Sequence, residues 1–168
     1  MTDVVAHLRP PLEGLAAGAA LVGGVALTTC ALFTVGAVLA DAVGVPILGD
    51  SEVVEMVVGA CIFAFLPYCQ MRDGHIAITL FTDRAPASMR RGLDLLAAVL
   101  TFAVALVLTW RLIVGGLDVW DKGRASMFLQ LPLWWGYAAG ALFSCLWTAT
   151  AAFGALDRAT ESTRSVRA

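Results

Sequence analysis

The residues most able to do chemistry form a charged turn in an otherwise apolar chain. Arg72, Asp73, Gly74 and His75 directly follow a long apolar run. An imidazole beside a carboxylate can transfer protons or bind a metal at neutral pH. The second histidine, His7, lies in a polar leader and not on a spanning helix, so the two are poorly placed to ligate a haem. No catalytic residue, metal ligand or cofactor is predicted from this turn.

Two carboxylates form the next candidate pair. Glu52 and Glu55 are three residues apart and would share one helix face. They could handle protons together. They also stand at the predicted start of a helix, where acidic side chains complement the helix dipole near water, and this second interpretation is favoured. No predicted span carries carboxylates, histidines or arginines at helical spacing, which a proton relay or ion pathway requires.

The other reactive side chains show no pattern of a cofactor site or an enzyme. The four cysteines lack CxxC spacing, so they indicate neither zinc nor a disulfide framework and are expected to be small buried hydrophobes. Phosphate-binding loops, Ser/His/Asp groupings and HExxH spacings are missing as well. The prediction is a protein that is not an enzyme and has no cofactor.

Composition defines the class of protein. Hydrophobic residues make up 60% of the 168 residues and charged residues 14%, with a mean hydropathy of +0.83. This is far more apolar than an ordinary soluble domain and predicts a membrane protein. The net charge of −2 and the absence of a Lys/Arg cluster interleaved with aromatics argue against a nucleic-acid partner.

Uncharged runs predict an all-α integral membrane protein, a single membrane domain over residues 1–168. The expected transmembrane helices are about 15–40, 52–71, 93–114 and 128–156. Gly115 and Gly116 are expected to open the loop before the last span. Residues 76–81 are too short to cross the bilayer, so they predict a short interfacial amphipathic segment between the second and third spans.

Charge placement predicts the orientation. In a four-span layout most arginines fall on one side, so both termini are expected in the cytoplasm. Glu52, Glu55 and Arg111 then lie near the outer interface, where Glu55 and Arg111 could form an ion pair. Asp118 and Asp121 add to an acidic outer surface.

Small residues at every fourth position predict helix packing. Gly136, Gly140, Ser144 and Thr148 form the clearest such stripe, in the last span. The first span repeats the same spacing less distinctly, at Gly14/Gly18, Ala19/Gly23 and Ala20/Gly24.

Several short motifs, in this order, resemble a known family. They are GDSEVVE at 49–55, RDGHI at 72–76, a loop with Gly123 and Ser126, and LPLW at 131–134 followed by Tyr137. Together they resemble the small membrane subunit of tripartite ATP-independent periplasmic (TRAP) transporters, the DctQ-like family, over roughly residues 16–153. Thr79 stands where that family often has an aspartate.

The resemblance implies a bacterial inner-membrane subunit that is not itself catalytic. It would scaffold a large sodium-coupled membrane subunit and help to dock a periplasmic substrate-binding protein, for uptake of a solute such as an organic acid. Arg72, Gly74 and His75 would contact the large subunit or lipid headgroups, or else form a simple turn in which His75 caps a helix. The acidic outer surface would face the binding protein. The alternatives are a membrane anchor of a redox complex and a small independent enzyme or exporter.

Overall fold

The computed structural model describes residues 2–72 and 87–167, and the side chains of residues 9–72 and 92–159. Each of its four helices contains a stretch that is long and apolar enough to cross a membrane, which confirms the predicted all-α membrane fold. The expected interfacial segment at 76–81 lies outside the described residues, together with Gly74, His75 and Thr79. The helices are α1 (Thr2–Ala42), α2 (Asp50–Met71), α4 (Ala87–Asp121) and α5 (Trp134–Arg167).

The helices differ from the expected spans at several ends. α4 runs on through Gly115 and Gly116, because these glycines pack against the ring of Tyr137 instead of forming a turn; a Cβ on either would lie 3.1 Å from that side chain. α5 begins only at Trp134, so residues 128–133 belong to the preceding loop. The positive φ of 53° at Gln130 is incompatible with a right-handed helix there.

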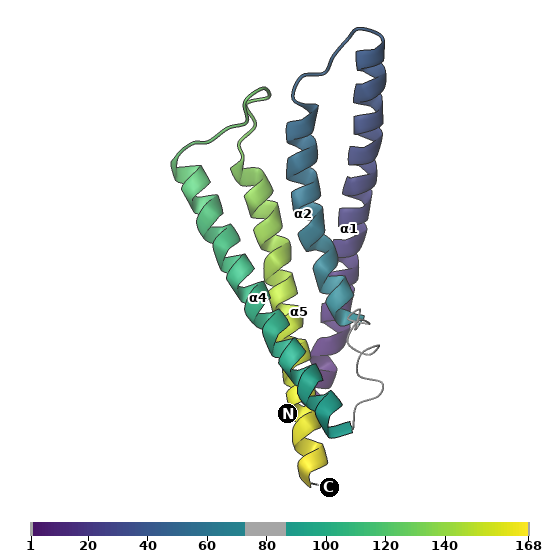
Figure 1. The fold of residues 1–168 in the computed structure, drawn as a ribbon, viewed down its shortest axis with the longest axis vertical. Helices are drawn as coiled ribbons and strands as arrows, with labels where there is room; N and C mark the ends of the chain where they lie inside the picture. The colour runs from purple at the N-terminus through teal and green to yellow at the C-terminus, as the bar shows by residue number, and fades with distance from the viewer. Residues whose placement is uncertain (1, 73–86, 168) are drawn as a thin grey trace.

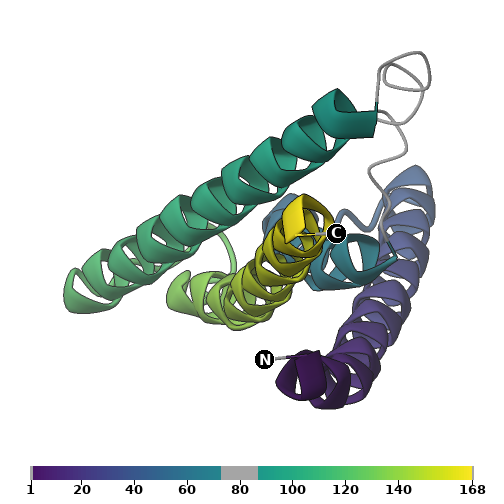
Figure 2. The same ribbon diagram turned by 90° about the horizontal axis from the view of Figure 1, so that it is seen from below.

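The helices form an open array and not a closed bundle. α5 packs along both α4 and α2, and α2 packs along α1, while α1 touches α5 only slightly. The order across the array is therefore α4, α5, α2, α1 (Figures 1 and 2). Both chain termini lie at one end of the array, here called the terminal end. The connections 43–49 and 122–133 lie at the other, the loop end, toward which the α4/α5 and α1/α2 pairs diverge (Figure 1).

Close backbone approach joins α1 to α2. A Cβ on Gly23 would lie 2.9 Å from Cβ of Ala64, and the Cys61 thiol donates to the Gly23 carbonyl at 3.4 Å. Gly24, its neighbour, has nothing within 4 Å. One of the three small-residue pairs of the first span, Ala19/Gly23, therefore faces α2 with both members buried. Such contacts let dispersion forces act over a long seam in a lipid environment.

The cysteines divide between two environments. Cys30 and Cys61 are buried, as the sequence predicted. Cys69 and Cys145 are exposed on the isolated chain, so the prediction of burial is wrong for them. Their positions on α2 and α5 face away from the seams between these helices, and apolar thiols are tolerated on a lipid-facing surface.

A buried group of hydroxyls joins α4 to α5. Thr109 Oγ1 lies 2.6 Å from Ser144 Oγ and 2.8 Å from Thr148 Oγ1, and it donates to the Ser144 carbonyl at 3.1 Å. Ser144 is fully buried. Because hydrocarbon offers no competing hydrogen bond, this hydroxyl cluster links the two helices at mid-span.

The rest of the stripe on α5 faces α2. A Cβ on Gly136 would lie 3.5 Å from the Met56 side chain, and one on Gly140 would lie 3.6 Å from the Phe63 ring. The four residues of the stripe thus lie along both sides of α5, with the glycines toward α2 and the hydroxyls toward α4. This explains how one helix can join two others.

Candidate functional site

The loop between α4 and α5 folds into a small hairpin. Ser126 N–H donates to the Leu131 carbonyl at 2.9 Å, and the Leu131 N–H donates back to Ser126 Oγ at 3.2 Å. An isolated antiparallel bridge joins Ala125 to Pro132. Gln130 turns the chain in the left-handed region. The buried Ser126 side chain therefore fixes the hairpin, and the residues at its tip, 127–129, are exposed.

Glu52 anchors the tip of this hairpin to α2. Its carboxylate accepts the N–H of Phe128 at 3.0 Å and that of Leu129 at 3.1 Å. These residues lie more than seventy positions away in the chain. Hydrogen bonds to an ionised acceptor are stronger than neutral ones, so one carboxylate bridges the two diverging helix pairs at the loop end.

Gly49 lets the two connections meet. It precedes α2 in the left-handed conformation, with φ 89°. A Cβ at this position would lie 2.7 Å from Cγ of Leu129 and 3.1 Å from Cβ of Phe128. Glycine is required here twice, once by the backbone conformation and once by the close contact with the hairpin. Gly49 is the N-cap of α2, and the Asp50 carboxylate accepts from the N–H of Ser51.

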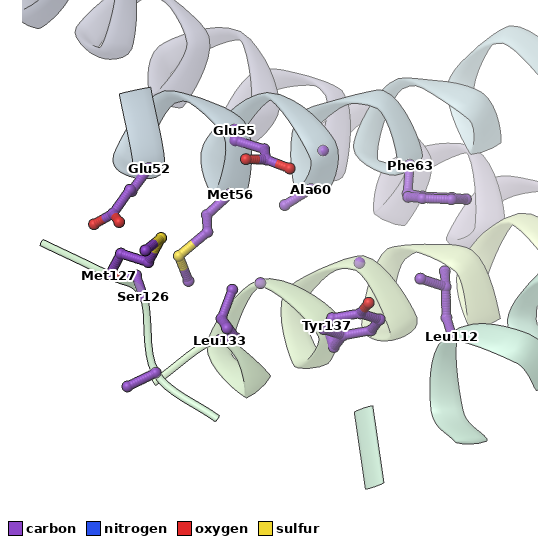
Figure 3. Close-up of a pocket in the computed structure, with 14 residues that line it drawn as sticks. Glu52, Glu55, Met56, Ala60, Phe63, Leu112, Ser126, Met127, Leu133 and Tyr137 are labelled. Carbon is purple, nitrogen blue, oxygen red and sulfur yellow. The ribbon is translucent and has the colours of Figure 1, made fainter. Parts of the chain in front are cut away.

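Behind this contact lies a cavity of about 490 Å³ between α2, α5 and the hairpin. Figure 3 shows Glu52 at its mouth, directed toward Ser126 and Met127, with Met56 and Tyr137 along the walls. Most of the lining is apolar, and its acidic side chains are Glu52 and Glu55. Such a space suits an apolar side chain or an acyl chain better than a charged solute.

Glu55 and Arg111, expected to pair, form no ion pair in the structure. Both side chains are exposed. The reason is the helix order: α4 packs on α5, so α5 lies between the helix that carries Arg111 and the helix that carries Glu55.

The two aspartates of the expected acidic surface differ in their surroundings. Asp118 forms an ion pair at 2.6 Å with Lys122, the residue that directly follows α4. Asp121 is exposed at the end of the same helix. Beside them the Trp120 and Trp134 rings meet edge to face with centroids 4.7 Å apart. These tryptophans are where an interfacial belt is expected, at the loop end of the spans.

Arg72 lies at the opposite end of the array. Its N–H donates to the Tyr68 carbonyl at 3.1 Å, which extends the hydrogen bonding of α2 by one residue. Its guanidinium carbon lies 5.4 Å from the centroid of the Tyr68 ring, in cation–π geometry. The structure therefore separates Arg72 from Asp118 and Asp121 by the length of a span.

Sequence reasoning missed three contributions to these sites. Thr109 carried no signal of its own, although a hydroxyl within a span facing a small-residue stripe is a reason to expect pairing. The amides of Phe128 and Leu129 could not be inferred, because every residue has an N–H. Within the described residues no group of three or more His, Cys, Asp or Glu side chains could hold a metal ion.

A comparison with protein-family models assigns most of the chain to a family. Residues 29–160 match the model described as "Tripartite ATP-independent periplasmic transporters, DctQ component". Neither the curated proteins nor the solved structures that were compared give a match. The matched region includes α2, α4 and both connections at the loop end, and it covers most of the chain. The chain therefore belongs to the DctQ family of tripartite ATP-independent periplasmic transporter components.

Proposed function

We propose that this chain is the small, non-catalytic membrane subunit of a TRAP-type transporter. In this role it scaffolds the large sodium-coupled subunit in the bacterial inner membrane, with both termini in the cytoplasm. It also helps to dock the periplasmic substrate-binding protein, for uptake of a solute such as an organic acid. Family membership supports the transport role, and the helix arrangement supports the role of a scaffold for the large subunit.

The observation that carries the proposal is the open order of the helices. α4 and α1 form the two edges of the array, and each has one principal neighbour. Large apolar side chains on these edge helices are exposed, such as Leu21 at 71% and Trp110 at 65%. An open array offers broad faces to lipid and to another membrane protein.

The loop end is the surface that we propose for docking. The hairpin held by Glu52 is a preformed structure, so little ordering entropy would be lost when a partner binds it. Asp121 is exposed beside it, while Asp118 is partly neutralised by Lys122. Charges on such a rim mainly change the rate of encounter.

Co-purification with a large multi-span partner tests the scaffolding role. The tagged chain, expressed with a candidate large subunit, should hold that subunit through detergent purification. Proteoliposomes that contain both should take up solute with binding protein and a sodium gradient, and liposomes with either subunit alone should not. Uptake by this chain alone, or a haem absorption band in the purified chain, would contradict the proposal, and the haem band would favour a redox anchor.

Charge reversal tests the docking role. Asp121→Lys at the loop end should slow uptake at low binding-protein concentration and change its dependence on salt. Asp94→Lys, near the other end of the same helix, is the matched control and should change neither the uptake rate nor its salt dependence. Unchanged kinetics and salt dependence in Asp121→Lys would remove the docking proposal but leave the scaffolding role standing.

A further inference from the structure

Three arginines lie at the terminal end of the array, each on or next to a different helix. Arg9 precedes the first expected span, 15–40, Arg72 directly follows α2, and Arg158 follows the last expected span, 128–156. All three thus lie at the boundary of a membrane span. Their guanidinium groups belong to the layer where hydrocarbon meets lipid headgroups.

Two adjoining cavities connect these arginines. One, of about 200 Å³, lies between α2 and α5, and the other, of about 530 Å³, lies between α1 and the end of α2. Arg9 and Met71 line both, so the two cavities adjoin, and together they are here called the arginine groove. Its first part also contains Gln70 and Arg158, and its second part contains Tyr68 and Arg72.

Hydrogen-bond donors converge in the narrow part of the groove. Gly154 leaves room there: a Cβ on it would lie 3.4 Å from Nε2 of Gln70 and 3.8 Å from Nη1 of Arg158. Gln70 is buried, with 5% of its surface exposed, and both residues make further interactions within the protein. An amide and a guanidinium thus present N–H groups over a position without a side chain.

The wide part of the groove holds its arginines in place in a different way. Arg72 stacks over the Tyr68 ring, which orients the guanidinium without using its N–H groups. Arg9 donates from Nε to Glu13 at 3.0 Å, so its two terminal nitrogens are not used in that bond. Among the described residues that line the groove, Glu13 and Asp157 stand against three arginines, a difference of one positive charge.

We propose that the arginine groove binds the headgroup of an anionic phospholipid. Its phosphate would lie among Arg9, Arg72 and Arg158, because guanidinium groups match phosphate oxygens in charge and in bidentate geometry. Basic pockets between spanning helices at the headgroup level suit such lipids. Met71 and Phe153 supply the apolar part of the lining, next to the start of the acyl chains. The proposal does not depend on the transporter role.

Lipid binding to the purified full-length chain provides the test. The delipidated protein in detergent is titrated with phosphatidylglycerol or with phosphatidylcholine of the same acyl chains, and bound lipid is counted by native mass spectrometry. Phosphatidylglycerol should bind more tightly. Arg72→Gln and Arg158→Gln should each weaken it about fivefold, since an arginine at the membrane surface contributes about that factor.

Two further variants separate the groove from a general effect of charge. Arg111→Gln removes an exposed arginine of α4 that does not line the groove, and it should leave binding unchanged. Gly154→Leu keeps every charge but fills the narrow part, and it should weaken binding. Helical circular dichroism confirms that each variant is folded. Equal affinity for the two lipids, equal loss in Arg111→Gln, or displacement of the lipid by inorganic phosphate would overturn the proposal.

Discussion

Alanine at Gly23 should destabilise the protein, whereas alanine at Gly24 should not. A Cβ at Gly23 would lie 2.9 Å from Cβ of Ala64, and ordinary contact begins near 3.4 Å, so α1 and α2 must separate by about 0.5 Å. Overpacking of this kind costs about 1 to 3 kcal/mol. The gain in helix propensity is common to both substitutions and cancels when the two variants are compared.

Unfolding in mixed micelles measures the difference. The purified protein is titrated with sodium dodecyl sulfate, and helical circular dichroism gives the free energy of unfolding. Gly23→Ala should be less stable than Gly24→Ala by about 1 to 3 kcal/mol. The seam also holds the bond from the Cys61 thiol to the Gly23 carbonyl, which any separation of the helices would lengthen.

A compensating change makes the reasoning refutable. Ala64→Gly removes the atom that an added Cβ would meet. The double variant Gly23→Ala with Ala64→Gly should therefore be more stable than the sum of the single effects predicts, with a coupling of about 1 kcal/mol. Equal stabilities for the two alanine variants, or strictly additive effects in the cycle, would show that this contact does not hold α1 against α2.

The remaining predictions concern the α4/α5 seam and the loop end. Thr109→Val should lower the free energy of unfolding by about 1 kcal/mol. The control Thr29→Val should be nearly neutral, because the exposed hydroxyl of Thr29 bonds within its own helix. Equal losses of stability in the two variants would contradict a stabilising role of the hydroxyl cluster. Gly49→Ala should cost more than Gly44→Ala in the same assay, because both have positive φ but only Gly49 meets the hairpin. Glu52→Gln should speed hydrogen exchange at the amides of Phe128 and Leu129, which donate to its carboxylate. Unchanged protection of these two amides would show that Glu52 does not hold the hairpin.

Hydropathy alone was enough to predict the class of fold but not the residues at which the helices begin and end. A run of apolar residues long enough to cross hydrocarbon is a local property, so four spans could be counted before any contact was known. The boundary at Gly115 was misplaced because glycine can either break a helix or let another helix approach. The ring of Tyr137, which decides between these uses, lies on a different helix.

The candidate sites show the same division. Arg72 and Glu52 stand out in the sequence because charge is rare in an apolar chain. Their partners do not, since Glu52 binds two backbone amides of a distant loop and Arg72 shares a cavity with Arg9. The expected pair of Glu55 with Arg111 fitted the depth of both residues in the membrane. Depth carries no information about which helix stands between them.

The sequence by itself determined that this is a membrane protein with four spans and, through its motifs, that it resembles the DctQ family, because composition, span length and motif order are read along one chain. Only the tertiary structure decided which of two adjacent glycines meets Ala64, which hydroxyl of α4 meets the stripe on α5, and which loop Glu52 holds. These depend on the rotation and order of the helices. Several faces of each helix are about equally apolar, so hydropathy does not decide which face meets a neighbouring helix. That depends on packing contacts between residues far apart in the chain.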